Sequence, residues 1–293
     1  MRILLTGGTG FIGANFGAAA VRAGHEVLSF SRQAWTPTEA RWLNVSAPIS
    51  NPPWTKIAEF VPDMLVHTAW EATPQTYLDS PENRDWVRTS EDLVKGLSTL
   101  GVTRFMVLGS CIEYAITGQP LREDVTPLAP QFAYSQSKAE LHQRLLRRFA
   151  QTANSLAWVR LFYPYGEHEH PQRLCSSLVR QFRQGERVTL RTPLSVKDYI
   201  HVDDVARGLV RIAESQYSGA INLGSGEGTT IQNLAQTIAR LMGRTELLNP
   251  PDSSVSDPLF HVVADTSRLQ RLGFFPQVPL EVGLRRLIDG RPS

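Results

Sequence analysis

The chain has 293 residues, of which 42% are hydrophobic and 20% charged, a balance typical of a globular protein with one large domain or two. The net charge is only +2 and no long basic run with interleaved aromatic residues occurs, so the composition gives no support for a nucleic-acid partner. No apolar stretch approaches the roughly 20 residues that span a bilayer, and the first residues lack the pattern of a signal peptide. We therefore expect a cytoplasmic protein without a membrane partner.

The first predicted strand, residues 3–5, leads into a glycine-rich turn. Residues 6–13 read Thr-Gly-Gly-Thr-Gly-Phe-Ile-Gly, and a helix predicted over 14–23 follows, with Gly24 as its stop. Glycines in this arrangement allow a tight turn, close approach of a phosphate and close packing of the helix on the strand. The pattern predicts a dinucleotide whose pyrophosphate lies at the helix N-terminus. The residues assigned to it are Gly7, Gly10, Phe11, Ile12 and Gly13.

Strands and helices then alternate along the chain. Strands are predicted over 25–30, 64–69 and 102–108, with a Pro- and Trp-bearing region to about residue 60 after the first of them. One helix is predicted from Ser80, its N-cap, and Pro81 to Gly101, and another over 134–150 is followed by a strand over 156–162. Because parallel strands need crossovers that cover the sheet, the alternation predicts an α/β fold, a doubly wound parallel sheet with helices on both faces.

The alternation breaks at residues 163–197, a polar, Arg-rich insert, and then returns. Asp203-Asp204 begins a helix to about Glu214, a strand is predicted over 220–223, and a helix begins at Thr230 and ends at Gly243. The remainder is Pro-rich and predicted to be irregular. We expect a cofactor-binding domain of residues 1–163 plus about 198–224, and a smaller substrate-binding cap of residues 164–197 plus about 225–293.

Tyr134 and Lys138 are four residues apart in a predicted helix, and therefore lie on one helix face. A neighbouring ammonium favours the phenolate and brings the pKa of a Tyr down from its ordinary value near ~10. With seven Tyr and four Lys in the chain, this spacing arises by chance only rarely. The pair is suited to moving a proton to or from a carbonyl oxygen. Upstream, Ser110 ends a strand at the sheet edge where doubly wound folds bind ligands.

With the glycine turn, the strand-end Ser and Tyr-x-x-x-Lys in this order, the chain resembles the extended short-chain dehydrogenase/reductase family of sugar-nucleotide epimerases, dehydratases and ketoreductases. That family has a Rossmann fold. The resemblance covers nearly the whole chain. It includes Val-His-Thr-Ala at 66–69, Arg-Leu-Phe-Tyr-Pro-Tyr-Gly at 160–166, Asp-Tyr-Ile-His-Val-Asp-Asp-Val-Ala at 198–206 and Asn-Leu-Gly-Ser-Gly at 222–226.

The resemblance implies roles for three residues. Tyr134 would be the general acid/base, Ser110 would hold the substrate oxygen, and Lys138 would lower the Tyr pKa and bind the cofactor ribose. Hydride transfer to a carbonyl builds charge on its oxygen, which a hydroxyl donor and a proton donor both stabilise. The resemblance also implies a homodimer, and we expect the helices at about 81–100 and 135–150, which carry apolar stripes, to form its seam.

Cofactor choice depends on the end of the second strand. NAD-preferring relatives commonly carry an acid there, whereas this chain has Ser31-Arg32. An Arg binds a 2′-phosphate bidentately, so NADP is favoured over NAD. The other residues predicted to contact the cofactor are Asn44, Thr68, Ala69, Tyr134, Lys138 and Tyr163.

The insert holds six cationic side chains and one acid, Glu186, between residues 173 and 197. Such a field suits a diphosphate-linked substrate, a nucleotide sugar, although Arg-rich helix faces also serve solubility alone. Two departures from relatives weaken this assignment: Tyr163 replaces an Asn, and residues 253–256 read Ser-Ser-Val-Ser where relatives often carry an Arg. The residues predicted to bind substrate are Trp70, Ser110, Cys111, Arg173, Arg191 and Lys197.

Other chemistry-bearing residues carry no separate function in this interpretation. His168-Glu169-His170 resembles a metal-ligand cluster, but no third ligand accompanies it at a telling spacing, and we predict no metal. His67 and His201 are interpreted as strand-end residues with hydrogen-bond partners. The two cysteines, Cys111 and Cys175, are too few for a disulfide framework.

The leading hypothesis is an NADP-dependent reductase of a nucleotide-linked 4-keto-6-deoxy sugar, with Tyr134 as proton donor. An epimerase with retained cofactor would use the same residues. A dehydratase is less favoured because Cys111-Ile112, rather than an Asp-Glu pair, follows Ser110. A reductase of non-nucleotide aldehydes or ketones and a non-catalytic cofactor-sensing protein remain alternatives.

Overall fold

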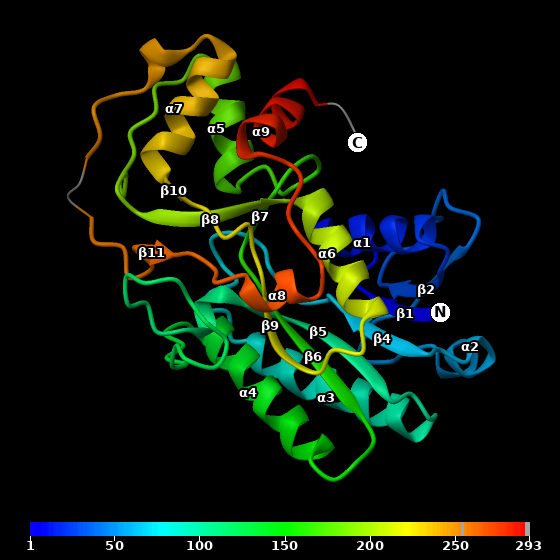
Figure 1. Cartoon of the computed structure of the whole chain (residues 1–293). Coiled ribbons are helices and arrows are strands. Elements are labelled where there is room, and N and C mark those ends of the chain that lie inside the picture. Colours follow the sequence, from blue (N-terminus) through cyan, green and yellow to red (C-terminus); the bar gives the residue numbers. More distant parts are fainter. Residues whose placement is uncertain (253–254, 291–293) are drawn as a thin grey trace. The chain divides into compact units, whose positions relative to one another are not determined.

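A sheet of seven strands dominates the computed structural model, which describes residues 1–252 and 255–290 (Figure 1). The pairings from β3 to β5 are parallel, and the family likeness reported below carries the same α/β architecture, so the predicted doubly wound sheet is confirmed. In register, Leu4 lies between Leu28 and Leu65. The strands, in spatial order, are β3 (Trp42–Ser46), β2 (Glu26–Ser31), β1 (Arg2–Thr6), β4 (Met64–His67), β5 (Arg104–Ser110), β6 (Ser155–Leu161) and β9 (Gly219–Leu223).

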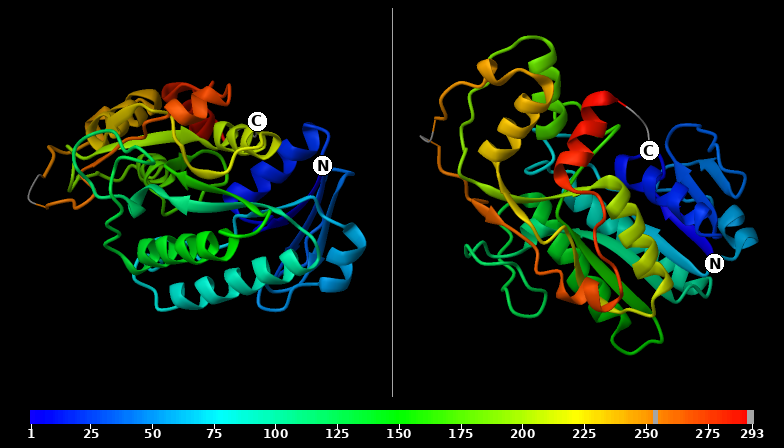
Figure 2. Two further views of the ribbon diagram at one scale, coloured as in Figure 1. Left: turned by 60° about the horizontal axis from the view of Figure 1, so that its bottom comes forward. Right: turned by 45° about the horizontal axis from the view of Figure 1, so that its top comes forward.

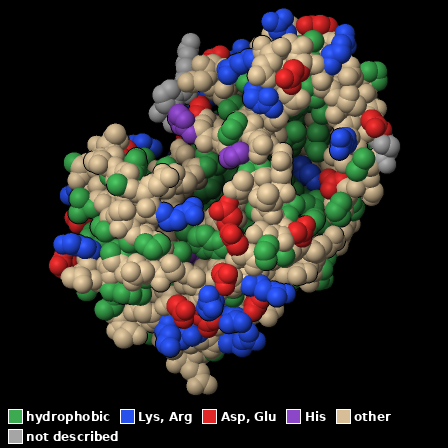
Figure 3. All heavy atoms as spheres, turned by 180° about the vertical axis from the view of Figure 1, so that it is seen from behind, with side chains coloured by type: hydrophobic (Ala, Val, Ile, Leu, Met, Phe, Trp, Pro, Cys, Tyr) green, Lys and Arg blue, Asp and Glu red, His purple; other side chains and the backbone are tan. Residues whose placement is uncertain are grey.

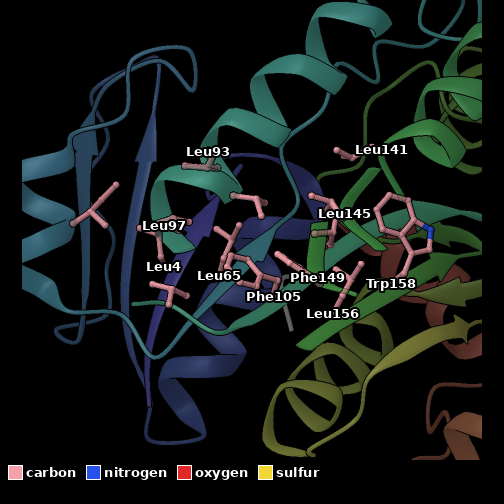
Figure 4. Close-up of a cluster of buried hydrophobic side chains, with 14 of the residues drawn as sticks. Leu4, Leu65, Leu93, Leu97, Phe105, Leu141, Leu145, Phe149, Leu156 and Trp158 are labelled. Atoms are coloured by element: carbon pink, nitrogen blue, oxygen red, sulfur yellow. The ribbon is translucent and has the colours of Figure 1, made fainter. Parts of the chain in front are cut away.

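Helices cover both faces of this sheet, as Figure 2 shows from two sides. The helices α3 (Asn83–Thr99) and α4 (Ala133–Phe149) lie side by side on one face, and α1 (Phe11–Arg22) and α6 (Val202–Glu214) lie on the other. Apolar residues at helical spacing on α3 and α4 meet the strands in one buried cluster (Figure 4). Its members include Leu4, Leu65, Leu93, Leu97, Phe105, Leu141, Leu145, Phe149, Leu156 and Trp158.

The chain divides into two compact units, which are described separately. Unit 1 holds Met1–Glu113, Leu128–Arg160 and Ala206–Ile221, and unit 2 holds Tyr114–Pro127, Leu161–Val205 and Asn222–Ser293. These boundaries differ from the predicted ones at 161–163, 198–205 and 222–224 and, over the longest stretch, at Tyr114–Pro127, a segment predicted to lie in the cofactor domain. The segment counts with unit 2 because Leu121 exchanges backbone hydrogen bonds with Val263 and Asp265, and such non-local pairing leaves no local sequence signal.

Unit 2 is built on a smaller sheet, against which the helices α5, α7 and α9 pack. Buried residues of these helices form a second core with Tyr165 and Tyr199. The carboxylate of Asp198 is buried among backbone donors from Ser225, Gly226 and Ala264, which ties the sheet to the C-terminal segment. The elements are β7 (Tyr163–Tyr165), β8 (Val196–His201), β10 (Gly228–Thr230), β11 (His261–Val262), α5 (Leu174–Arg183), α7 (Ile231–Met242) and α9 (Leu280–Asp289).

Two element predictions need correction, and one region for which no element was predicted contains two. The helix α3 begins at Asn83 rather than Pro81, because the Asn83 amide bonds back to the Tyr77 and Ser80 carbonyls and holds the preceding residues in turns. The Pro- and Trp-bearing region contains β3 and the helix α2 (Trp54–Phe60). The C-terminal remainder contains α8 (Ser267–Arg271) and the ten-residue helix α9.

Both ends of α7 agree with the prediction, whereas α1 begins at Phe11, three residues before its predicted start. The helix α7 has Thr230 as N-cap, whose hydroxyl accepts the Asn233 N–H at 3.0 Å, and Gly243 as a left-handed C-cap with φ 64°. Among the described residues, no helix has the length and apolar character needed to cross a membrane.

Candidate active site

The turn between β1 and α1 is shaped by two glycines. Gly7 has φ +74°, and its carbonyl accepts the Gly10 N–H at 2.9 Å, which closes the turn. A Cβ on Gly13 would come within 2.0 Å of the Gly7 oxygen, so α1 approaches the turn as closely as a backbone allows. The first-turn N–H groups of α1, with glycine as N-cap, form the kind of site that binds a phosphate. The cradle therefore fits the pyrophosphate of a dinucleotide, and Phe11 and Ile12 begin the helix beside it.

The ends of β1 and β4 are tied together next to this turn. The Thr68 hydroxyl donates to the Thr6 carbonyl at 2.7 Å, and the Ala69 N–H donates to the Thr6 hydroxyl at 3.3 Å. A Cβ on Gly7 would meet the Thr68 hydroxyl oxygen at 2.6 Å, so Thr68 and Ala69 border the turn as predicted residues of the cofactor site should. This edge lies where the strand order reverses around β1, the position at which doubly wound sheets bind ligands.

His67 is a buried, neutral strand-end residue. Its Nδ1 lies 2.7 Å from the Thr6 hydroxyl and its Nε2 lies 2.9 Å from the Ser90 hydroxyl. Burial, together with the charge of Lys138, lowers the pKa of His67 to about 3. His67 therefore has hydrogen-bond partners on both ring nitrogens, as expected for a strand-end residue.

The ends of β2 and β3 carry the residues predicted to select the cofactor. The Asn44 amide oxygen accepts the Ser29 hydroxyl at 2.9 Å, and the Ser31 hydroxyl donates to the Gln33 carbonyl at 2.8 Å. Arg32 is exposed. The pKa of Glu71, which follows β4, is lowered mainly by hydrogen bonds from Thr73 and further by the charge of Arg32. Arg32 therefore lies on the carboxyl side of the sheet, on the same side as the glycine turn.

Ser110 ends β5, and its backbone is held by Glu113 in the short 3₁₀ helix η1 (Cys111–Glu113). The Ser110 N–H donates to Glu113 Oε1 at 2.7 Å, and its hydroxyl oxygen accepts the Ile112 N–H at 3.5 Å. Cys111, predicted to contact substrate, is only 4% exposed and packs as a core side chain.

Tyr134 and Lys138 lie together in the first two turns of α4. The Tyr134 N–H donates to the Leu78 carbonyl at 2.8 Å, which fixes the start of the helix. The Lys138 ammonium nitrogen is 5.7 Å from the centre of the Tyr134 ring and donates to the Leu108 carbonyl of β5 at 2.8 Å. Leu108 is two residues before Ser110, so the three predicted catalytic residues share one region of unit 1.

Trp70 covers the Lys138 ammonium, an arrangement that the sequence does not reveal. The ammonium lies 3.7 Å from the centre of the indole ring, and the indole N–H donates to Asn83 Oδ1 at 2.9 Å. Burial lowers the pKa of Lys138 from 10.5 to about 7, while the charge of Glu113 raises it. Trp70 also packs edge-on against the Tyr134 ring at 6.2 Å.

The predicted site residues of unit 2 have different surroundings. The Lys197 ammonium is buried, 2.8 Å from the Asp257 carboxylate, and it also bonds the Leu259 carbonyl. Its charge is therefore paired within unit 2, contrary to the prediction of a cation presented to a diphosphate. Tyr163 lies under this ammonium, with its ring centre 5.6 Å away, Arg173 is the N-cap of α5 and Arg191 is exposed. Residues 253 and 254, where relatives often carry an Arg, lie outside the described residues.

The histidine cluster shows no metal site. His168 and His170 are exposed, and within residues 1–252 and 255–290 no group of three or more His, Cys, Asp or Glu side chains is placed to hold a metal ion. His201 is buried at the end of β8, where its Nδ1 accepts the Asp203 N–H at 3.2 Å and its Nε2 faces the Glu167 carboxylate at 3.2 Å.

Sequence reasoning missed the buried ion pair of Glu113 and Arg160. Arg160 Nε donates to Glu113 Oε2 at 2.9 Å, and both side chains are at most 2% exposed. A signal was present, because a Glu inside Cys-Ile-Glu-Tyr and an Arg inside Trp-Val-Arg-Leu are opposite charges within two apolar runs. Charges in such runs are almost never fully buried unless paired.

Comparison with known proteins shows the family to which the chain belongs. Residues 3–224 match the model of the NAD dependent epimerase/dehydratase family. The UDP-glucuronic acid decarboxylase 1 of Danio rerio is 26% identical over 313 residues, which cover 98% of this chain and 72% of that protein.

Two solved structures share the fold. The UDP-N-acetylglucosamine 4-epimerase of Methanobrevibacter ruminantium, in complex with UDP-N-acetylmuramic acid, has a TM-score of 0.88 at 20% identity and covers 99% of this chain and 97% of its own. The UDP-glucose 4-epimerase of Thermus thermophilus, in complex with NAD, has a TM-score of 0.85 at 22% identity, with 99% and 98% covered.

Proposed function

The chain belongs to the NAD dependent epimerase/dehydratase family, and on that premise we propose that it is an NADP-dependent reductase of a nucleotide-linked keto-deoxy sugar. The observation that carries the proposal is the convergence of Ser110, Tyr134 and Lys138 at the end of β5, in the same unit as the glycine turn. The nicotinamide of the bound cofactor would supply the hydride. The chain's own residues would handle the charge that develops on the carbonyl oxygen.

In this mechanism Tyr134 donates a proton to the substrate oxygen and Ser110 donates a hydrogen bond to it. Lys138 lies close enough to the Tyr134 ring to favour its phenolate form once the proton has left. The turn at Gly7 and Gly13 would receive the pyrophosphate, and Lys138 would hold the ribose.

Arg32 supports NADP as the exchangeable cofactor. It is exposed on the carboxyl side of the sheet, directly after Ser31 at the end of β2, where a 2′-phosphate would meet a cation rather than a carboxylate. The solved relative from Thermus thermophilus was crystallised with NAD, so the preference of this chain is a point to test.

A dehydratase has no support, because Glu113, the carboxylate that follows Ser110 along the chain, is bonded to Arg160 and Trp158 in the core.

Two other functions have specific support. An epimerase with retained cofactor would use the same three residues, and both solved relatives named above are epimerases. A reductase of uncharged aldehydes or ketones is supported by the pairing of Lys197 with Asp257, because this cation is then not available to bind a substrate diphosphate.

The test is turnover of a substrate panel with NADPH or NADH, followed by absorbance of the reduced nicotinamide. The panel contains UDP- and dTDP-linked 4-keto-6-deoxy sugars, UDP-glucose and simple aldehydes. We expect stoichiometric NADPH consumption with a nucleotide-linked keto sugar. Interconversion of UDP-glucose without net consumption would establish the epimerase instead, and preference for simple aldehydes would establish the uncharged-carbonyl reductase.

The Arg32→Ala variant tests cofactor choice in the same assay. Loss of a charge-assisted hydrogen bond should weaken NADPH binding by about 2 kcal/mol and leave NADH binding nearly unchanged. Titration of cofactor fluorescence measures both affinities. The matched control is Arg41→Ala, an exposed Arg at the opposite end of the neighbouring strand β3, which should affect neither. Equal losses for NADPH and NADH in Arg32→Ala would show that Arg32 does not read the 2′-phosphate.

A further inference from the structure

Glu113 is a fully buried carboxylate that the proposed reaction does not use. Its Oε1 accepts the Ser110 N–H at 2.7 Å, and its Oε2 accepts Arg160 Nε at 2.9 Å. The indole N–H of Trp158 donates to both oxygens, at 3.1 and 3.2 Å. Glu113 therefore joins the end of β5, where Ser110 lies, to two side chains in the interior of β6.

The fit around this carboxylate is tight. A Cβ on Gly109 would lie 2.5 Å from Glu113 Oε1 and 2.3 Å from the Trp158 indole nitrogen. The residue before Ser110 must therefore be glycine for the carboxylate to reach the backbone. Trp158 is held from its other side by the His142 ring, stacked at 4.5 Å.

Stability alone does not explain the buried ion pair of Glu113 and Arg160. Taking two charges out of water costs several kcal/mol each, and well-packed apolar residues of similar volume often serve stability equally well or better. The hydrogen bond from the Ser110 N–H to Glu113 differs from the ion pair in this respect, because no apolar residue could accept it. The N–H that Glu113 holds belongs to the residue predicted to bind the substrate oxygen.

We propose that Glu113 is a positioning residue for Ser110, with its carboxylate anchoring the Ser110 backbone to Arg160 and Trp158 so that the Ser110 hydroxyl is held at the carbonyl-binding position. The inference rests on the proposed function, because it needs Ser110 to contact the substrate. It deepens that function by assigning the geometry of Ser110 to a side chain that touches neither substrate nor cofactor.

Two variants separate the reach of Glu113 from its charge. Glu113→Asp keeps the negative charge beside Arg160 but is one methylene shorter, so it cannot hold Arg160 and the Ser110 N–H together. Glu113→Gln keeps the length but loses the charge, which also acts on Lys138. Should the Gln variant fail to fold, the Asp variant, with its ion pair retained, still decides the question.

The assay uses the whole chain with NADPH and a UDP-linked 4-keto-6-deoxy sugar as the probe. A misplacement of about 1 Å costs up to about 10²-fold in rate, so Glu113→Asp should lower kcat about tenfold to hundredfold. KM and the NADPH dissociation constant should stay within twofold of wild type. Glu59→Gln, which removes an exposed carboxylate paired with Lys56, is the control and should leave kcat unchanged.

The Ser110→Ala background distinguishes positioning from a general structural effect. If Glu113 acts through Ser110, Glu113→Asp should reduce kcat by less than about twofold once the hydroxyl is gone, because residues acting as one unit are non-additive. An equal fold loss in both backgrounds, or a wild-type kcat in Glu113→Asp, would overturn the proposal.

A measurement on the protein without cofactor gives an independent readout. Amide hydrogen exchange at Ser110 should be faster in Glu113→Asp than in wild type, and unchanged in Glu59→Gln. Unchanged exchange at Ser110 would overturn the positioning role of Glu113. The outcomes also separate the two proposals: wild-type turnover in Ser110→Ala defeats the proposed function, whereas an impaired Ser110→Ala beside a normal Glu113→Asp defeats only the positioning role.

Discussion

Lys138 is a cation kept in the interior of unit 1, at 2% exposure. Its described contacts are a carbonyl oxygen and the faces of two aromatic rings, which compensate a charge less fully than water does. Burial brings its pKa to about 7, so small changes in its surroundings decide whether it is charged near neutral pH. In the proposed mechanism Lys138 supports proton transfer by Tyr134, and a pKa near neutral pH suits that role.

Tyr134 is the residue whose loss should be most specific. The Tyr134→Phe variant deletes the proton and keeps the ring that packs on Trp70 and Tyr77. Removal of a positioned acid should lower kcat roughly 10²–10⁴-fold while cofactor binding stays normal. Steady-state kinetics with NADPH and the keto-sugar probe, beside a cofactor titration, measure both quantities. Unchanged turnover would remove Tyr134 from the mechanism.

At this scale the sequence predicts residues that belong to short, continuous motifs. The glycine turn, Ser110 and the Tyr134–Lys138 pair lie where their spacing places them. It does not predict partners that come from distant segments. Lys197 contacts Asp257, 60 residues further along the chain, and Trp70, which follows β4, contacts Lys138 of α4. Charge counts along the chain treat Lys197 as available because they contain no information on such pairing.

The packing of α4 on β6 makes the stability of unit 1 depend on pH. The His142 ring is stacked on Trp158, and burial lowers its pKa from 6.5 to about 3. The unfolded chain binds this proton near pH 6.5 and the folded protein does not, so the stability is present above pH 6.5 and is lost as the pH falls toward 3.

We therefore expect the pH dependence of unfolding to weaken in His142→Phe, which keeps a ring on Trp158 but cannot titrate. As the pH is lowered, the free energy of unfolding should decrease less steeply in the variant, by about 1.4 kcal/mol per pH unit relative to wild type. The contribution of His67 should remain in both proteins. All six Trp residues lie in unit 1, so Trp fluorescence during urea unfolding at pH 4 to 7 reports on that unit. The exposed His170→Gln is the control, and an unaltered slope in His142→Phe would contradict the assignment.

Helices and strands were predictable where apolar residues recur at a regular spacing and a recognisable capping residue marks each end. The helix α7 shows both, with Thr230 and Gly243 at its ends. The helix α9 also has Leu280, Leu284 and Leu287 at helical spacing, but its Pro-rich surroundings masked a helix of only ten residues. Short elements of this kind take their stability from a partner surface, here the second core, rather than from their own sequence.

For the molecule as a whole, alternation of strands and helices predicted the sheet but not which segments complete it. The order of the seven strands depends on pairings between separate segments, such as Ile3 with Met64. The grouping of Tyr114–Pro127 with unit 2 depends on contacts between residues more than 100 positions apart, such as Asn222 with Leu121. Local periodicity carries no record of these pairings, because each strand satisfies the same apolar pattern beside any neighbour.

The prediction of a homodimer through α3 and α4 needs a different physical basis from the one the sequence suggested. The apolar stripes of both helices are buried in the core of unit 1 and are not available to a second copy (Figure 4). The exposed side instead carries ion pairs of Glu91 with Arg144 and Arg148, at 2.9 and 3.0 Å, and α4 also exposes Leu146 on a different side of the helix. Figure 3 shows acidic and basic side chains side by side at the bottom of the molecule, where α3 and α4 lie in Figure 1.

We expect light scattering at micromolar concentration to give twice 32.7 kDa, and the Leu146→Glu variant to give the single-chain mass. The substitution replaces an exposed apolar side chain of α4 with a carboxylate, so two copies that associate through this helix would have to bury a new charge. Leu194→Glu, at a more exposed apolar position in unit 2, is the matched control and should leave the mass unchanged. A wild-type chain that scatters as 32.7 kDa refutes the dimer, and a dimer that dissociates with Leu194→Glu but survives Leu146→Glu moves its seam away from α3 and α4.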